Sequence, residues 1–94
     1  MLSIKDQVLL VSGKIDFENA EQYYQHGLKL IQAQPLPLAV NLSELEQGST
    51  LALAVLIRWL RQTPNAQGLH FQAVPQKMLK IIQACHLQHD LTLI

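Results

Sequence analysis

Two adjacent hydroxyl residues, Ser49 and Thr50, stand directly before a run of apolar residues and could bind an anion or carry a phosphate. The unpaired backbone N–H groups and the positive dipole end of a helix start favour an anion. A phosphate on one of these hydroxyls would add about −1.5 to −2 charges there. Alternatively, the two side chains only cap the helix through an oxygen. Thr50 is therefore a candidate contact or phosphorylation site, with helix capping as the alternative.

The run that follows, residues 51–61, is apolar at nearly every position and carries two arginines near its end. A helix that buries one side would be polar over about half of its positions, so this segment predicts apolar surface that a partner covers. It is shorter than the roughly 20 apolar residues of a membrane span. Tryptophan and arginine are enriched at interface hot spots, although Trp59 fits ordinary packing on a sheet equally well. The candidate partner-binding residues are Ser49, Thr50, Leu51, Leu53, Ala54, Arg58 and Trp59.

Metal binding and catalysis find little support in the sequence. Of the four histidines, only His86 and His89 lie near the single cysteine, Cys85, and structural zinc requires a second pair of ligands. Cys85 shares its helical spacing with Met78 and Ile82, which predicts a small core residue and not a nucleophile. Glycine-rich phosphate loops and Gly-x-Ser-x-Gly motifs do not occur. We predict no catalytic residue, no metal and no cofactor.

Composition favours a protein as the partner. Seven Lys and Arg residues balance seven Asp and Glu residues without a basic cluster, which excludes the electrostatic footprint of a nucleic-acid-binding protein. Hydrophobic residues make up 49% of the chain and charged residues only 15%, a lean surface that favours association. One cysteine excludes an internal disulfide, and the N-terminal sequence does not resemble a signal peptide. We expect one cytoplasmic domain spanning residues 1–94.

Hydrophobic patterns in the first third of the chain predict two strands and a helix. Residues 2–5 and 7–13 form a hairpin around Asp6 and Gln7. Asp16 is a candidate N-cap for a helix that runs to about Ala33, and Gly27 weakens this helix slightly. Only one of the adjacent residues Tyr23 and Tyr24 can face the core. The expected apolar face consists of Phe17, Ala20, Tyr24, Leu28 and Ile31.

The rest of the chain alternates strands and helices. Residues 38–42 read as a strand buried on both faces, residues 43–48 as a polar loop, and residues 49–62 as the second helix, which ends before a connection at 63–68. A strand at 69–74, a third helix opened by Pro75 and a short strand at 91–94 complete the order. This alternation predicts an α/β fold with a small, mixed, mostly parallel sheet and about three to four helices, crowded on one face.

Two motifs resemble the STAS domain family. Residues 12–16, Ser-Gly-Lys-Ile-Asp, resemble the family's Gly-Glu-Leu-Asp signature, and residues 40–43, Val-Asn-Leu-Ser, resemble its central strand. From there to Ser49 and Thr50, the spacing is that at which the family places Asp followed by Ser or Thr before its second helix. The resemblance covers essentially the whole chain and implies a single STAS-like domain.

Within this family the chain looks most like the MlaB-type subunits of the bacterial ABC system that moves phospholipids and maintains outer-membrane lipid asymmetry. The resemblance implies a non-catalytic cytoplasmic subunit, peripheral to the inner membrane of a Gram-negative bacterium. Its partner would be an MlaF-like ATPase within a larger membrane transporter complex, without nucleic acid and without direct membrane insertion. The implied docking element is the helix that begins at Ser49, together with residues 44–48 before it.

Other members of the family are anti-sigma factor antagonists, in which a partner kinase phosphorylates the hydroxyl that matches Thr50. This alternative function needs features that the chain lacks. Ser49 stands where those relatives have a carboxylate, and Leu51 and Ala52 stand where they have a small residue and a glycine. The resemblance therefore implies that Thr50 is kept as a contact position while the phosphorylation switch is absent.

Overall fold

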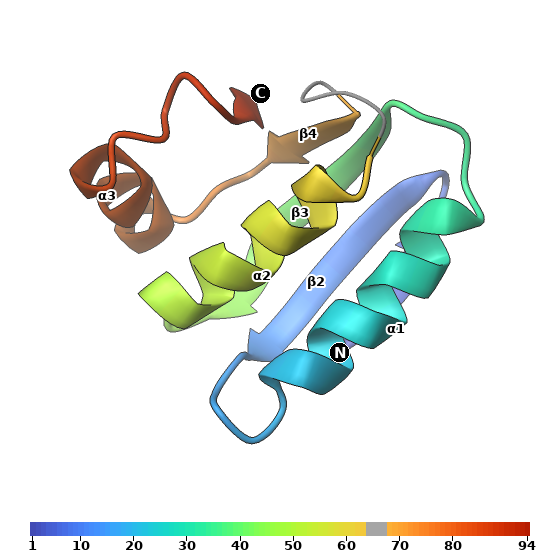
Figure 1. Cartoon of the computed structure of the whole chain (residues 1–94), viewed down its shortest axis with the longest axis horizontal. Helices are drawn as coiled ribbons and strands as arrows, with labels where there is room; N and C mark the ends of the chain where they lie inside the picture. The colour runs from blue at the N-terminus through green and yellow to red at the C-terminus, as the bar shows by residue number, and fades with distance from the viewer. Residues whose placement is uncertain (64–67) are drawn as a thin grey trace.

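The computed structural model describes residues 1–63 and 68–94 (Figure 1). Within these ranges, one sheet of five strands has the spatial order β1-β2-β3-β4-β5. The strands are β1 (Leu2–Lys5), β2 (Val8–Lys14), β3 (Leu38–Glu46), β4 (Leu69–Gln72) and β5 (Thr92–Leu93). β1 is antiparallel to β2, and every other neighbouring pair is parallel. This mixed, mostly parallel sheet confirms the predicted fold class.

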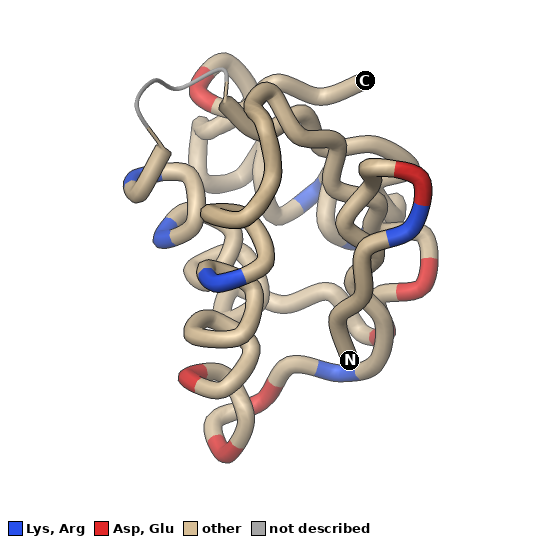
Figure 2. Tube along the Cα trace, turned by 90° about the vertical axis from the view of Figure 1, so that its right-hand side faces the viewer, with Lys and Arg blue, Asp and Glu red and all other residues tan. Residues whose placement is uncertain are grey.

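Three helices in the described ranges connect the parallel strands: α1 (Ala20–Gln32), α2 (Thr50–Arg61) and α3 (Gln76–Ala84). All three lie on the same face of the sheet, as Figures 1 and 2 show, and none of the described helices covers the other face. The prediction was that the helices crowd one face more than the other, and in the described ranges all of them lie on one face (Figure 1). α2 lies in the middle of it and contacts both α1 and α3. None of these helices combines the length and apolar content of a membrane span.

The predicted hairpin is confirmed. Leu2 of β1 pairs with Val11 of β2, and the connection consists of Asp6 and Gln7. Both connecting residues have positive φ, 52° and 63°, which is the backbone conformation of the tightest two-residue hairpin turns. This turn fixes the register in which Leu2 and Val11 face the helices together.

One hydrophobic core lies between the sheet and the helix layer. Alternate residues of the three central strands are buried in it: Leu9, Val11, Leu38, Val40, Leu42, Leu69 and Phe71. Their neighbours on the opposite face, such as Asn41 and His70, are only half-buried. The prediction that the central strand is buried on both faces is therefore wrong, because the described helices cover one face only.

β3 is longer than predicted and takes up most of the expected loop at residues 43–48. After a bulge in β3, where Leu42 and Ser43 stand opposite Val11 of β2, parallel pairing between β2 and β3 continues as far as Lys14 and Glu46. Polar side chains hid this extension in the sequence, yet the backbone pairing with β2 satisfies its N–H and C=O groups. The connection to α2 shrinks to residues 47–49. Residues 64–67 of the predicted connection after α2 lie outside the described residues.

α1 begins at Ala20, later than predicted. Asp16 does act as a cap, because its Oδ1 accepts hydrogen bonds from the N–H groups of Glu18 (2.9 Å) and Asn19 (3.0 Å). However, the capped residues form a separate turn before the helix. Phe17, which was expected in the core, is 92% exposed on this turn.

The C-terminal third contains two further corrections. β4 ends at Gln72, two residues earlier than predicted, and Ala73 has a positive φ of 53°. Pro75 is the N-cap of α3, and Met78 and Ile82 are buried as expected. Cys85 is exposed, so its assignment to the core is wrong. The physical reason is that α3 ends at Ala84, so that Cys85 has left the helical path that buries Met78 and Ile82.

Candidate functional site

Ser49 and Thr50 lie at the carboxyl edge of the parallel strands, where β3 turns into α2. Ser49 is the N-cap of α2, and its Oγ accepts a hydrogen bond from the N–H of Ala52 at 3.1 Å. This bond satisfies one of the backbone donors that a helix start leaves unpaired. Thr50 is the first helical residue and is exposed. The structure thus gives the capping role to Ser49 and leaves Thr50 at the surface.

The turn before Ser49 is held tightly against α3. A Cβ atom on Gly48 would lie only 2.6 Å from Cγ of Met78, and both residues are buried. Gln47, just before it, has a positive φ of 48°. Since any side chain at position 48 would collide with Met78, the contact fixes the start of α2 relative to α3.

α2 presents a narrow strip of accessible residues. Thr50, Ala54 and Arg58 are exposed at a spacing of four, and Leu51 and Ile57 are half-buried beside them. Residues four apart lie on the same side of a helix. We refer to these five residues as the α2 stripe. It contains four of the predicted partner-binding residues, and Ser49 lies half-buried at its beginning.

The two other predicted contact residues are buried and cannot meet a partner in this conformation. Leu53 is 4% exposed and Trp59 is 0% exposed. The indole of Trp59 lies against Gly27 of α1, and its Nε1–H donates a hydrogen bond to the carbonyl oxygen of Tyr24 at 3.0 Å. Trp59 therefore packs inside the domain and joins α2 to α1, which corresponds to the packing alternative.

The domain itself covers most of the apolar surface of α2. The buried residues of the helix are Ala52, Leu53, Val55, Leu56 and Trp59. Because α2 lies over the sheet with α1 on one side and α3 on the other, three sides of the helix are covered instead of one. The apolar excess that predicted a partner is thus mostly explained by this central position. What remains accessible is the exposed Ala54 and the partly buried set Leu51, Ile57 and Leu60.

Arg58 is exposed, and contacts with two residues of α1 hold its guanidinium in place. Its Cζ lies 3.7 Å from the centroid of the Tyr24 ring, and its Nη1 lies 3.4 Å from Oε1 of Glu21. Both charged side chains face solvent, so the ion pair contributes at most about 1 kcal/mol, and the cation–π contact contributes about 0.5–1 kcal/mol. The main effect of these contacts is to orient the guanidinium at the end of the α2 stripe.

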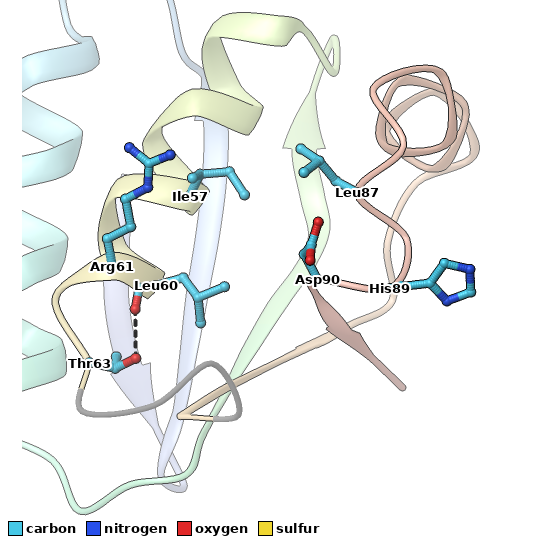
Figure 3. Close-up of a pocket in the computed structure, with 7 residues that line it drawn as sticks. All are labelled: Ile57, Leu60, Arg61, Thr63, Leu87, His89 and Asp90. Atoms are coloured by element: carbon cyan, nitrogen blue, oxygen red, sulfur yellow. Dashed lines mark hydrogen bonds between the residues drawn. The ribbon is translucent and has the colours of Figure 1, made fainter.

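A groove with a volume of about 470 Å³ lies beside the C-terminal half of α2. Its lining residues are Ile57, Leu60, Arg61, Thr63, Leu87, His89 and Asp90. In Figure 3 the side chains of Ile57 and Leu87 point toward each other across the groove, whereas His89 points away. Thr63 Oγ1 donates a hydrogen bond to the carbonyl oxygen of Leu60 at 2.6 Å. An apolar centre with a polar rim is typical of protein contacts.

Cys85, His86 and His89 are all exposed at the end of α3 and in the segment after it. Over residues 1–63 and 68–94, no three His, Cys, Asp or Glu residues are grouped so that they could hold a metal ion. The described part of the chain therefore offers no ligand set from which a metal centre could be built.

The two adjacent tyrosines differ as expected: Tyr24 is buried, and Tyr23 is only partly buried. The Tyr23 hydroxyl donates a hydrogen bond to the carbonyl oxygen of Ser12 at 2.7 Å. Burial raises the pKa of Tyr23, and the nearby carboxylates of Glu46 and Asp16 raise this pKa further. One carboxylate follows β2 and the other ends β3, so the segments after these two strands come together near Tyr23.

Comparisons with known proteins point to one family. The family described as Mlab, STAS domain, matches residues 2–94. Two structures of the Acinetobacter MlaFEDB complex, in the ATP-bound Vtrans1 and Vtrans2 conformations, contain a chain that is 64% identical to this one. The alignments cover 100% of this chain and 100% and 99% of those chains, with TM-scores of 0.92 and 0.93.

A more distant similarity is to an anti-sigma factor antagonist from Mycobacterium paratuberculosis. The two chains are 25% identical, the alignment covers 99% of this chain and 81% of the other, and the TM-score is 0.74. A comparison with curated protein sequences finds no match. The fold is thus shared with the antagonist, while the sequence is much closer to the chain from the MlaFEDB complex.

Proposed function

This chain belongs to the STAS domain family, and from that membership we propose that it is an accessory subunit of an MlaFEDB-type ABC transporter. The observation that carries the proposal is the 64% identity with a chain of the Acinetobacter complex over the full length of both. The family match over residues 2–94 supports a single domain. Its partner is then the MlaF-like ATPase subunit of a transporter that moves phospholipids and maintains outer-membrane lipid asymmetry.

In this role the subunit is non-catalytic and lies on the cytoplasmic side of the inner membrane, held there by the ATPase. The α2 stripe is our candidate for the contact. Thr50 and Ala54 are small enough for close approach, and Arg58 is already oriented by Tyr24 and Glu21. A standard interface covers roughly 800 Å² on each partner. That area is more than one helical stripe offers, so the contact includes neighbouring surface.

The alternative function is that of an anti-sigma factor antagonist switched by phosphorylation of Thr50. The 25% identity to such an antagonist supports the shared fold, but it is far below the 64% identity to the transporter chain. The hydroxyl of Ser49, at the position of the family's carboxylate, is engaged in capping α2. Stoichiometric phosphate on Thr50 of the native protein, detected by mass spectrometry, would favour the antagonist function.

The test of the proposed function is affinity purification of the tagged chain from native membranes, followed by identification of the co-purifying proteins. We expect an ABC ATPase together with the other transporter subunits. Recovery of a kinase and a sigma-factor regulator, without the ATPase, would contradict the proposal.

A charge substitution tests the place of contact. Thr50→Glu puts a carboxylate into the α2 stripe, and we expect weaker retention of the ATPase because an unpaired charge at a contact is costly to desolvate. Ser3→Glu is the matched control, since it adds the same charge at an exposed position of β1, on an edge strand away from α2. Full retention of the ATPase by Thr50→Glu would exclude the stripe as the contact.

A further inference from the structure

Phe17 is the most exposed of the large apolar side chains in the described part of the chain, with 92% of its surface open to solvent. Burying a phenyl ring is one of the largest gains that a small domain can make. The spacing of Phe17 to Ala20 and Tyr24 would suit a continuous helix with the ring in the core, yet the structure leaves the ring outside. A single exposed apolar side chain is common on protein surfaces, so the case for a role of Phe17 rests on how its turn is held and on the charges around it.

The backbone around Phe17 is held by a network of hydrogen bonds. Asp16 Oδ1 accepts from the N–H groups of Glu18 and Asn19, and Asn19 Oδ1 accepts from the N–H of Asp16 at 2.8 Å. Asn19 Nδ2 also donates to the carbonyl oxygen of Lys14 at 2.9 Å. Reciprocal side-chain bonds of this kind fix a turn in one conformation. The turn therefore presents the ring of Phe17 to solvent at a defined place.

The surroundings of Phe17 are acidic. Five of the seven carboxylates of the chain occur in residues 16–21 and 44–46, together with Lys14 just before them. These segments are neighbours because Lys14 of β2 is in register with Glu46 of β3. Figure 2 shows acidic residues gathered at one end of the helix layer and basic residues toward the other end. An apolar ring within a negative field is complementary to an apolar pocket with a basic rim.

The turn that carries Phe17 and the accessible side of α2 belong to one continuous surface. Both the turn and the start of α2 follow neighbouring parallel strands and lie at the same end of the molecule (Figure 1). Farther along, Glu21 of α1 pairs with Arg58 of the α2 stripe, so that α1 and α2 form one surface. The ring and the stripe can therefore contact the same partner.

We propose that Phe17 is an anchor for the ATPase subunit and inserts into an apolar pocket of that subunit whose rim carries Lys or Arg side chains. This inference rests on the proposed function and extends its contact from α2 to the β2–α1 turn. The carboxylates around the ring pair with the basic rim. Two separate contact points also fix the rotation of the subunit about the α2 axis, which a single helical stripe leaves undetermined.

The experiment measures the affinity of the full chain for its cognate ATPase subunit by titration calorimetry, for the wild type, Phe17→Ala and Leu36→Ala. We expect Phe17→Ala to bind about tenfold or more weakly, as truncation of a hot-spot aromatic does. Its urea unfolding midpoint should stay unchanged because the ring is already exposed. Leu36→Ala is the control: it truncates another exposed apolar side chain, in the connection between α1 and β3, and should bind like the wild type.

The outcomes separate the two proposals. If the wild type binds and Phe17→Ala binds equally well, the anchor is refuted and the accessory function stands. If Leu36→Ala weakens binding as much, or if Phe17→Ala lowers the unfolding midpoint, the anchor is also refuted, because the effect is then general or structural. If the wild type fails to bind the ATPase at all, the accessory function is refuted together with the anchor.

Discussion

Replacing Gly27 with alanine tests how closely α1 packs on α2. Gly27 lies inside α1, and in an exposed helix interior alanine is favoured over glycine by about 1 kcal/mol. Helix propensity alone therefore predicts that Gly27→Ala stabilises the protein. The structure predicts the opposite, because a Cβ atom at position 27 would lie 2.2 Å from Cζ2 and 2.5 Å from Cε2 of Trp59.

The ring of Trp59 cannot move away cheaply, since it is fully buried and its Nε1–H is bonded to the carbonyl oxygen of Tyr24. Overpacking a core costs about 1–3 kcal/mol, and leaving a buried N–H without its partner costs about 1–3 kcal/mol more. With the gain in helix propensity subtracted, we expect Gly27→Ala to lower the free energy of unfolding by about 3 kcal/mol. For a domain of this size the loss corresponds to a fall in Tm of about 10–25 °C.

The assay is urea and thermal unfolding followed by circular dichroism, which does not depend on the tryptophan. Gln25→Ala, on the exposed side of the same helix, is the matched control and should change the free energy of unfolding by less than about 0.5 kcal/mol. In the double variant Gly27→Ala/Trp59→Phe, the smaller ring removes the overlapping atoms. The cost of Gly27→Ala should therefore be smaller in the Trp59→Phe background than in the wild type.

The reasoning is refuted if Gly27→Ala is as stable as the wild type or more stable. In that case the helices separate slightly at little cost, and helix propensity decides the outcome. If Gly27→Ala lowers the free energy of unfolding equally in the wild-type and Trp59→Phe backgrounds, the loss does not come from the contact with the indole.

Three further predictions follow from the same structure. Ser49→Ala removes the cap of α2 and should lower the free energy of unfolding in urea by about 1 kcal/mol, whereas Ser49→Asp should keep it; equal stability of both variants would contradict the capping role. Cys85 is exposed and should react with a thiol reagent in the folded protein; reaction only in denaturant would contradict this. Burial, and then Glu46 and Asp16, raise the pKa of Tyr23, so folding favours its protonated form. The resulting stability is fully present below the ordinary tyrosine pKa of about 10 and is lost as the pH rises through the raised folded pKa. Tyr23→Phe should make the decline of the unfolding free energy at alkaline pH less steep. An unchanged decline would contradict the contribution of Tyr23.

Several features of the fold were predictable because their causes are local in sequence. The hairpin depends on two residues that adopt positive φ between two short apolar runs. The capping by Ser49 and Asp16 depends on side-chain oxygens that reach N–H groups two or three residues ahead. The order of strands and helices, and hence the mostly parallel sheet, follows from the alternation of apolar periodicities.

Two errors, one in the predicted elements and one in the predicted site, originate in contacts between distant segments. The extension of β3 to Glu46 depends on its pairing with β2, which no local polar pattern reveals. The burial of Trp59 depends on a glycine in another helix. The exposure of Phe17 has a local origin instead, because hydrogen bonds of Asp16 and Asn19 form a separate turn before α1 begins. The pair of Asp16 and Asn19, residue types that favour turns, was the one signal of this turn in the sequence.

By itself, the sequence determined the kinds of elements, their order and the position of Thr50 at a helix start, since these depend on neighbouring residues and their spacing. Only the tertiary structure decided which residues of α2 face a partner. In the sequence the run is apolar in every direction around the helix axis. In the structure the sheet, α1 and α3 cover three sides of the helix and leave the α2 stripe accessible, with Thr50, Ala54 and Arg58 as its exposed residues. Burial is set by what packs against a side chain, and those neighbours come from distant parts of the chain.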